Sequence, residues 1–279
     1  MKVIDGIVIT GAGGFLGRAL GDDLSRLGIP FLALSRRALP GVRQVASYDD
    51  APEAEIIVHL AEACDRASVN HMGDRYADDA YALVDALSNR TRRLVYASSS
   101  VVYGDSTEEP LSTDSPLVPT DTYARSKIRN EGRVRDTGGL VLRLANLYGS
   151  GMSTGNVLSD IARQIPGNGA LRIRDAAPVR DFLSVAEAAT AIVLAIRKDA
   201  EGVLNIGSGD GLSVGDVARL ALKIFGEERR PIESSRPDTR RSINVLDVSA
   251  TRDRIGWSPV PADVGLTHFF KSRGARIES

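Results

Sequence analysis

The sequence predicts an α/β fold built on a parallel sheet, with a smaller α/β lobe in its C-terminal part. Three observations support this prediction. Short apolar segments alternate with helix-like segments in the first half, a glycine-rich turn follows the first apolar segment, and the alternation weakens after Tyr148. Because strands separated by helices form βαβ units, we expect parallel strands with helices on both faces of the sheet, a doubly wound arrangement.

The expected strands are short apolar runs rich in β-branched residues, which suits strands buried on both faces. They cover residues 3–10, 31–34, 55–60, 93–97 and 139–144. Two helices are expected between them, over residues 14–27 and 78–87. Gly28 and Pro30 follow the first of these helices and are typical stop signals.

Two further helices are expected in the second half. Ser184 and Glu187 have the S-x-x-E spacing of a capping box, and apolar residues follow at helical intervals. The second of these helices begins at Ser213 and ends at Gly226. We expect residues 1–150 to form the sheet domain, with segments near 180–206 returning to it. Residues 151–279 are expected to form mainly the smaller lobe.

Composition excludes several classes of protein. The 279 residues include 35 Lys and Arg against 36 Asp and Glu, so the chain has no overall basic charge to attract nucleic acid. The single cysteine, Cys64, cannot form an internal disulfide or a cysteine-rich metal site, and we expect no metal. No apolar stretch approaches the roughly 20 residues that cross a bilayer. We therefore expect a cytoplasmic protein without nucleic-acid or membrane partners.

The glycine-rich turn has the spacing G-x-x-G-x-x-G, at Gly11, Gly14 and Gly17. These glycines permit a tight turn, a close backbone approach to a pyrophosphate, and close packing of helix on strand. The first helical turn, with Phe15 and Leu16, offers free N–H groups to an anion. In a strand–turn–helix this pattern predicts a Rossmann-type dinucleotide-binding domain; the alternative is a glycine-rich turn without a ligand.

The end of the second strand bears on the choice of dinucleotide. An acidic residue about 20 residues beyond the glycines usually binds the ribose 2′-hydroxyl of NAD. Here the strand ends in Ser35, Arg36 and Arg37, and no acid is present. Because arginine can accept a 2′-phosphate, the sequence favours NADP over NAD. The alternative is that both arginines are solvated surface charges.

A tyrosine and a lysine, Tyr123 and Lys127, are spaced i, i+4 and share one helical face. A free phenol has a pKa near 10, and a neighbouring ammonium favours the phenolate. Tyr123 is therefore a candidate general acid or base. Upstream, an apolar strand runs into three serines at 98–100, at the strand end where ligands bind in open parallel sheets. One serine could hydrogen-bond the reacting oxygen.

Taken together, the motifs resemble a known family. They are T-G-A-G-G-F-L-G at 10–17, I-V-H-L-A at 57–61, S-S-S-V-V-Y-G at 98–104, Y-A-R-S-K at 123–127, L-R-L-A-N-L-Y-G at 142–149, V-R-D-F-L-S-V at 179–185 and N-I-G-S-G at 205–209. In this order they resemble an extended short-chain dehydrogenase/reductase of the NAD-dependent epimerase/dehydratase family. Most members of that family act on nucleotide sugars.

The resemblance also implies roles for particular residues. The catalytic residues it implies are Ser99, Tyr123 and Lys127. Beside the glycine loop, Leu60 and Ala61 would border the cofactor, and Tyr123 and Lys127 would contact it. The implied substrate-binding residues are Ser99, Ser100, Asn146, Arg180 and Arg236, with Arg240 as the alternative to Arg236.

The resemblance implies a nucleotide-sugar 4-epimerase or 4-keto reductase, between which the sequence does not choose. Sugar dehydratases of the family carry an Asp-Glu pair directly after the catalytic Ser or Thr, whereas Ser100 and Val101 stand there. Members often form homodimers through paired helices, including the tyrosine-bearing one. Two rival interpretations remain: a non-catalytic dinucleotide-binding regulatory protein, and a reductase of a non-sugar carbonyl.

Overall fold

The computed structural model describes residues 4–104, 109–236 and 242–274. A seven-stranded parallel sheet forms its larger part, in the order β10-β6-β5-β4-β1-β2-β3. The strands are β1 (Ile4–Thr10), β2 (Phe31–Ser35), β3 (Arg43–Gln44), β4 (Ala54–His59), β5 (Thr91–Ser99), β6 (Leu140–Leu144) and β10 (Gly202–Ile206). This order and the parallel pairing confirm the predicted doubly wound, Rossmann-type fold.

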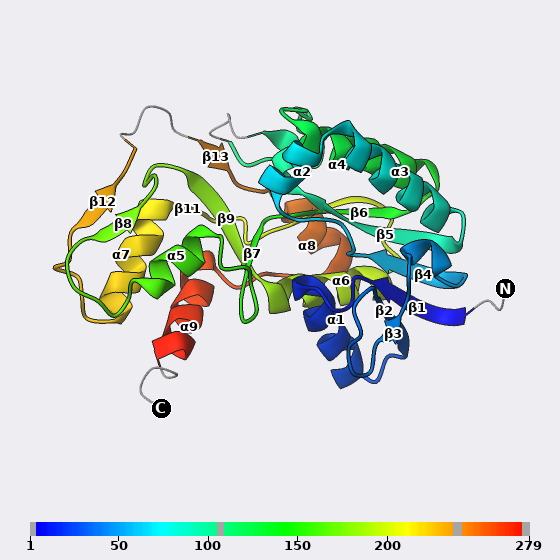
Figure 1. Ribbon diagram of the computed structural model, residues 1–279, viewed down its shortest axis with the longest axis horizontal. Helices are drawn as coiled ribbons and strands as arrows, with labels where there is room; N and C mark the ends of the chain where they lie inside the picture. The colour runs from blue at the N-terminus through cyan, green and yellow to red at the C-terminus, as the bar shows by residue number, and fades with distance from the viewer. Residues whose placement is uncertain (1–3, 105–108, 237–241, 275–279) are drawn as a thin grey trace.

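Helices cover both faces of this sheet (Figure 1). On one face, α3 (Asp74–Ser88) packs against α4 (Thr122–Asp136), beside the short α2 (Arg66–Met72). On the other face, α1 (Phe15–Arg26) packs against α6 (Val185–Arg197), and α8 (Ser249–Ile255) contacts β10 and α6. The sheet is therefore the middle of three layers.

The central strands are largely apolar because their side chains contribute to a core on each face of the sheet. In β4, Ile56 and Val58 belong to the core under α1 and α6, whereas Ile57 belongs to the core under α3 and α4. Side chains alternate between the faces of a strand, so both sets must be apolar when both faces are covered.

The smaller lobe has its own sheets and core. Its strands are β7 (Asn146–Tyr148), β9 (Val179–Ser184), β11 (Gly211–Ser213) and β13 (Ile243–Asn244), all arranged around β9, with a separate pair of β8 (Leu171–Ile173) and β12 (Ile232–Ser234). Its helices are α5 (Val157–Arg163), α7 (Val214–Ile224) and α9 (Ala262–Gly274). Short 3-10 turns, η1 (Tyr48–Asp50) and η2 (Ser100–Tyr103), complete the set.

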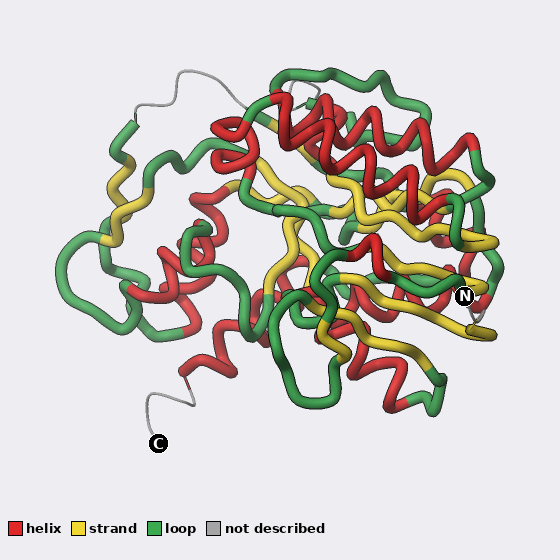
Figure 2. Tube along the Cα trace, turned by 45° about the vertical axis from the view of Figure 1, so that its right-hand side comes forward, coloured by secondary structure: helices red, strands yellow, loops and turns green. Residues whose placement is uncertain are grey.

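The carboxyl ends of the parallel strands point toward the smaller lobe, as the ribbon and the tube both show (Figures 1 and 2). The chain crosses between the lobes several times: β7 leaves the large sheet, and α6 and β10 return to it. Residues at the carboxyl ends of β1, β4 and β5 consequently face residues from a different part of the chain.

The expected caps have a mixed outcome. Ser184 caps α6 by accepting from the N–H of Glu187, and Ser213 caps α7 in the same way through Asp216. A full capping box also needs the Glu187 carboxylate to accept from the N–H of Ser184. That part of the prediction is wrong, because the Glu187 carboxylate accepts from the N–H of Val260 instead. In the described part of the chain, that contact ties α6 to the segment that leads into α9.

Candidate active site

The glycine loop lies between β1 and α1 and is closely packed. A Cβ on Gly17 would lie 2.2 Å from the carbonyl oxygen of Gly11, and one on Gly11 would lie 2.7 Å from the carbonyl oxygen of Leu60. Gly11 also has φ +74°, which favours glycine. Only glycine fits at these two positions, so the loop packs closely against the first turn of α1 and against the residues that follow β4.

The loop has the features of an anion cradle. Gly14 caps α1 without any side chain accepting from the first-turn N–H groups, which include those of Phe15 and Leu16. The helix dipole adds positive potential at this end. Leu60 lies against the loop through its N–H, which donates to the carbonyl of Thr10, and Ala61 follows it. The residues present therefore fit the pyrophosphate of a dinucleotide.

The end of β2 brings two arginines to this loop. Ser35 is buried, and its hydroxyl accepts from the N–H of Arg37. The Arg37 guanidinium donates to the carbonyl of Gly13 at 3.0 Å, and so does that of Arg18. Arg36 lies over the ring of Tyr48, 5.7 Å from its centroid. Arg18 was not singled out from the sequence, although its place in the first helical turns could have indicated it.

Helix α4 begins where Asp121 caps it by accepting from the N–H of Ala124. Asn70, on α2, binds the same region twice. Its amide donates to Asp121, and its carbonyl oxygen accepts from the backbone N–H of Tyr123. These contacts fix the first turn of α4, which carries the tyrosine, against α2. Tyr123 itself is buried, with 8% of its surface exposed.

Lys127 connects α4 to the end of β5. Its Nζ donates to the carbonyl of Ala97 at 2.7 Å and lies 5.9 Å from the ring centroid of Tyr123. Ala97 is two residues before Ser99, which ends β5 and caps η2. The predicted lysine thus lies near the predicted tyrosine and beside the strand end that carries the predicted serine.

A buried acid, Glu62, completes this cluster and was not predicted. Its Oε2 lies 2.7 Å from Nζ of Lys127 and accepts from the hydroxyl of Tyr96, and its Oε1 accepts from the amide of Asn130. Glu62 follows Leu60 and Ala61 at the carboxyl end of β4. A charged residue directly after an apolar strand, at the ligand-binding edge, was the signal that could have identified it.

Burial and pairing determine the charges in this cluster. Burial alone would raise the pKa of Glu62, but Lys127 holds that pKa below its usual value. Burial would lower the pKa of Lys127, but Glu62 keeps it well above its usual value. His59 is fully buried, which lowers its pKa to about 4, so this imidazole is neutral at pH 7. The result is one buried ion pair among uncharged neighbours.

A second buried ion pair lies on the same helix. Glu131 of α4 and Arg143 of β6 are each 2% exposed, with 2.7 Å between their nearest charged atoms. Ser98 and Tyr103 complete the hydrogen bonding of this pair. The pair joins α4, β5 and β6 beneath the strand end that carries Ser99.

The residues expected to bind substrate lie at the junction of the lobes and in the smaller lobe. Ser100 is buried, and its carbonyl accepts from the amide of Asn244. Asn146 is exposed on β7, and its amide donates to the carbonyl of Asp181. Arg180, on β9, donates to the carbonyl and hydroxyl oxygens of Ser242.

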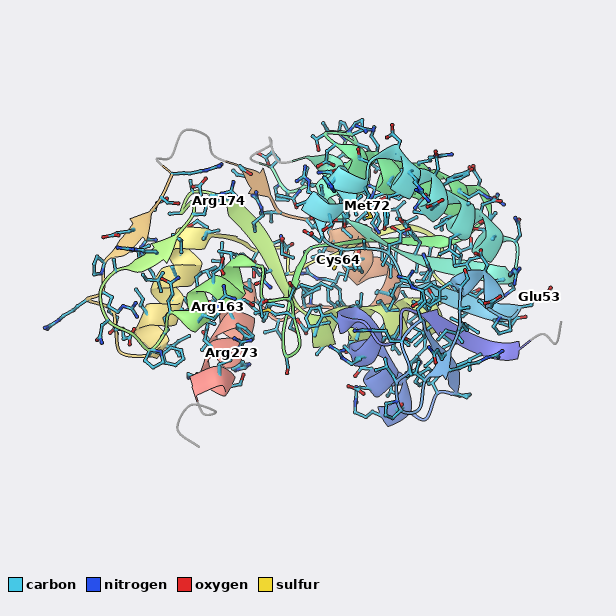
Figure 3. All side chains as sticks on the ribbon, in the orientation of Figure 1. Glu53, Cys64, Met72, Arg163, Arg174 and Arg273 are labelled. Atoms are coloured by element: carbon cyan, nitrogen blue, oxygen red, sulfur yellow. The ribbon has the colours of Figure 1, made fainter. Side chains whose placement is uncertain are left out.

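Arg236 does not line the cavity of about 420 Å³ in the smaller lobe, but its backbone is bonded to a residue that does. Its N–H donates to the carbonyl of Arg174, which lines the cavity together with Arg163 and Arg172 over the apolar side chains of Val157, Ile173 and Val214. Figure 3 labels Arg163 and Arg174 on this lobe, on the opposite side of the central Cys64 from the large sheet's helices α3 and α4. The alternative residue Arg240 lies outside the described residues.

Within residues 4–104, 109–236 and 242–274, no group of three or more His, Cys, Asp or Glu could hold a metal ion. Over the same ranges, no helix is long and apolar enough to span a bilayer.

The combination of a Rossmann-type sheet, a glycine cradle and a Tyr-Lys pair beside a serine defines a short-chain dehydrogenase/reductase type of protein. The model of the NAD dependent epimerase/dehydratase family matches residues 7–207, and the chain belongs to this family. The resemblance predicted from the motifs is confirmed.

Individual relatives are similar at low identity. The chain is 26% identical over 209 residues to a UDP-glucose 4-epimerase of Streptomyces lividans, covering 66% of this chain and 64% of that one. It is 26% identical over 287 residues to a dTDP-6-deoxy-L-talose 4-dehydrogenase (NAD(P)(+)) of Kitasatospora kifunensis, covering 91% and 90%. A solved structure of MoeE5 in complex with UDP-glucuronic acid and NAD superimposes with a TM-score of 0.82 at 25% identity, covering 98% and 99%.

Proposed function

We propose that this protein is a dinucleotide-dependent enzyme that oxidises or reduces a nucleotide sugar at C4, as a 4-epimerase or a 4-keto reductase. One observation carries the proposal above the others. Lys127 donates to the carbonyl of Ala97, two residues before Ser99 at the end of β5, and its Nζ lies 5.9 Å from the ring centroid of Tyr123. A dinucleotide-binding loop without this arrangement of Ser99, Tyr123 and Lys127 would indicate a protein that binds a dinucleotide but catalyses no reaction with it.

The proposed roles follow from the chemistry of each side chain. The phenol of Tyr123 takes the proton of a sugar hydroxyl, or returns it to a carbonyl oxygen. The hydroxyl of Ser99 donates a hydrogen bond to the same oxygen and fixes its position. The ammonium of Lys127 favours the phenolate when the proton is lost. When bound, the dinucleotide supplies or accepts the hydride.

The proposed cofactor is NADP in preference to NAD. Ser35 ends β2 where an acid would bind a free ribose 2′-hydroxyl, and Arg36 and Arg37 follow it. Arg37 lies against the glycine loop through Gly13, so its guanidinium is near the end of the cradle. A 2′-phosphate would gain charge-assisted hydrogen bonds from these side chains. The talose dehydrogenase relative, named for both NAD and NADP, is compatible with this choice.

The proposed substrate carries its nucleoside diphosphate on the smaller lobe. The cavity is lined by Arg163, Arg172 and Arg174, by Asp160 and Asp175, and by the apolar side chains of Val157, Ile173 and Val214. Its arginines could pair with a diphosphate and its apolar side chains could contact a flat base. Asn146 on β7 and Arg180 on β9 belong to the same lobe and are the residues proposed to contact the sugar and the diphosphate. The related UDP-glucose epimerase and dTDP-sugar dehydrogenase support this class of substrate.

A homodimer remains a proposal. Helix α4, the tyrosine-bearing helix expected to take part in the pairing, forms ion pairs with α3 of the same chain, between Arg125 and Asp74 and between Arg129 and Asp78. A dimer interface formed by α3 and α4 would therefore have these charged side chains at its edge. Sedimentation velocity tests it: a mass of twice 29.8 kDa supports the dimer, and a mass of 29.8 kDa excludes it.

The test of the proposed function is direct. Purified protein is denatured, and the released NAD(H) and NADP(H) are quantified; unfolding midpoints are then measured with each added. Retained NAD would support a self-recycling epimerase and contradict the NADP preference. Selective stabilisation by NADPH would support a reductase. Absence of any response would favour a non-catalytic protein, and turnover of a simple carbonyl without nucleoside diphosphate binding would favour a non-sugar reductase.

A further inference from the structure

The ion pair between Lys127 and Glu62, within the catalytic cluster, is more enclosed than a surface ion pair. The side chains of Lys127 and Glu62 are only 7% and 9% exposed, and their charged atoms are 2.7 Å apart. A buried lysine without a partner would tend to lose its proton, because burial disfavours the charged form. The partner therefore decides whether Lys127 is charged.

The carboxylate of Glu62 is held by hydrogen bonds to both of its oxygens, in addition to its contact with Lys127. The amide of Asn130 donates to Oε1 at 2.9 Å, and the hydroxyl of Tyr96 donates to Oε2 at 3.0 Å. A buried carboxylate with these donors stays ionised, since hydrogen bonds to the charged form stabilise it. Glu62 cannot rotate away from Lys127 without breaking both contacts.

The head group of Lys127 is fixed by the same arrangement. One N–H is directed to the carbonyl of Ala97 and a second to Glu62, which leaves one N–H among the described residues for a bound ligand or for Tyr123. The ring of Tyr96 lies beneath the ammonium, 4.8 Å from Nζ to the centroid. Glu62 thus orients Lys127 as well as keeping it charged.

The other titratable groups that face this pair carry no charge near neutral pH. His59 on β4 is neutral because burial lowers its pKa to about 4. Burial and Glu62 together raise the pKa of Tyr96 on β5 and of Tyr76 on α3. Tyr123 on α4 is the reacting phenol. Within the described residues, Glu62 is therefore the one negative charge that faces Lys127.

We propose that Glu62 is a positioning residue that keeps Lys127 in its ammonium form and in place beside Tyr123, and so extends activity into alkaline solution. The inference rests on the proposed function for the role of Lys127 in turnover. Its electrostatic part stands without that function, because it concerns the charge of Lys127 alone.

The experiment measures the charge of Lys127 directly. The sequence has five lysines, so the ¹³Cε resonances of isotope-labelled lysine are few, and Lys127→Arg identifies the one of interest. In Glu62→Gln we expect this resonance to titrate about one to three pH units lower than in the wild type, the range for losing an opposite charge at close distance. Turnover of the variant should fall at alkaline pH, where the wild type stays active.

Two variants separate this effect from a loss of packing. Glu131→Gln removes the other buried carboxylate of α4, whose partner is Arg143, and should lower the unfolding midpoint without moving the Lys127 titration. Glu62→Asp keeps the negative charge, so Lys127 should titrate at nearly the same pH as in the wild type. This variant can also be measured if Glu62→Gln does not fold.

Unchanged titration of Lys127 in Glu62→Gln, or an equal shift in Glu131→Gln, would overturn the proposal. So would an alkaline loss of turnover that Glu62→Asp does not reduce. If the wild type turns over no nucleotide sugar while the Lys127 titration shifts as expected, the proposed function fails and the electrostatic role of Glu62 is supported.

Discussion

Lys127 donates a hydrogen bond to the carbonyl of Ala97, two residues before Ser99, across a distance of 2.7 Å. This contact joins the first turns of α4 to the carboxyl end of β5. Ser99 and Lys127 are 28 positions apart in the sequence. The fold brings them close together because the carboxyl ends of parallel strands meet at one edge of the sheet. The proposed chemistry depends on that junction.

Tyr123→Phe removes the hydroxyl that is proposed to move the proton. We expect turnover to fall by about 10²- to 10⁴-fold with the fold retained, which is the usual contribution of a general acid or base. Tyr81→Phe on α3 is the control, since Tyr81 packs under Arg129 away from the cluster. Steady-state kinetics that show equal rates for Tyr123→Phe and the wild type would exclude catalysis by Tyr123.

Gly17→Ala should disrupt the dinucleotide cradle. Its Cβ would lie 2.2 Å from the carbonyl oxygen of Gly11, so the helix must move, at a cost of about 1–3 kcal/mol. Stabilisation by added dinucleotide should be lost as well. Gly21→Ala on the same helix is the matched control.

A Cβ on Gly21 would lie 3.5 Å from the ring of Phe31, an ordinary contact. Alanine is favoured over glycine within helices, so this variant should be as stable as the wild type or more so, by up to about 1 kcal/mol. Thermal unfolding with and without dinucleotide compares the two variants. Full dinucleotide stabilisation of Gly17→Ala would contradict the cradle.

The double variant Arg36→Ala/Arg37→Ala tests the choice of cofactor. A lost charge-assisted hydrogen bond costs about 1.5–3 kcal/mol, which corresponds to roughly 10- to 150-fold in affinity. We expect weaker binding of NADPH and unchanged binding of NADH in fluorescence titrations. A similar loss for both dinucleotides would mean that the arginines do not recognise the 2′-phosphate.

The buried His59 predicts a loss of stability in acid. Burial lowers its pKa to about 4 in the folded protein, whereas a free imidazole has a pKa of 6.5, so the unfolded chain binds the proton first as the pH falls. The contribution of neutral His59 to the free energy of unfolding is present above pH 6.5 and is lost as the pH falls toward 4. Between pH 7 and pH 5 the free energy of unfolding should fall by about 2 kcal/mol from this group.

Urea unfolding of His59→Gln at both pH values measures this contribution. The variant should lose less stability than the wild type between pH 7 and pH 5, whatever its stability at pH 7. The control is His71→Gln, on the exposed side of α2, which should follow the wild type. Identical pH dependence of His59→Gln and the wild type would show that His59 is not the group responsible.

The fold was predictable because its signals are local. Apolar β-branched runs such as residues 55–60 and the glycine turn depend only on neighbours in sequence, and the structure has strands and a turn there. The short helices α2 and α5 were not predicted. They have seven residues each, and Asp65 and Asn156 cap them within polar segments that resemble loops.

The candidate site was predictable only in part. Motif residues such as Tyr123 and Lys127 could be named, but Glu62 could not, because its role depends on Asn130 and Tyr96 from other elements. The cavity lined by Arg174 is formed by residues of α5, β8 and the start of α7, and no sequence pattern brings those elements together. Sequence patterns do not predict which distant segments of the chain come into contact.

The most direct test uses nucleotide sugars with deuterium at C4. Wild type and Tyr123→Phe are incubated with NADP or NAD and with UDP-, dTDP-, GDP- and CDP-linked sugars, and the products are separated by chromatography, which resolves epimers, before mass spectrometry. We expect the wild type to form either a C4 epimer that retains deuterium or a 4-keto sugar whose deuterium has moved to the dinucleotide. We expect Tyr123→Phe to form neither at a comparable rate. Absence of both products from the wild type, or equal formation by the variant, would contradict the proposed function.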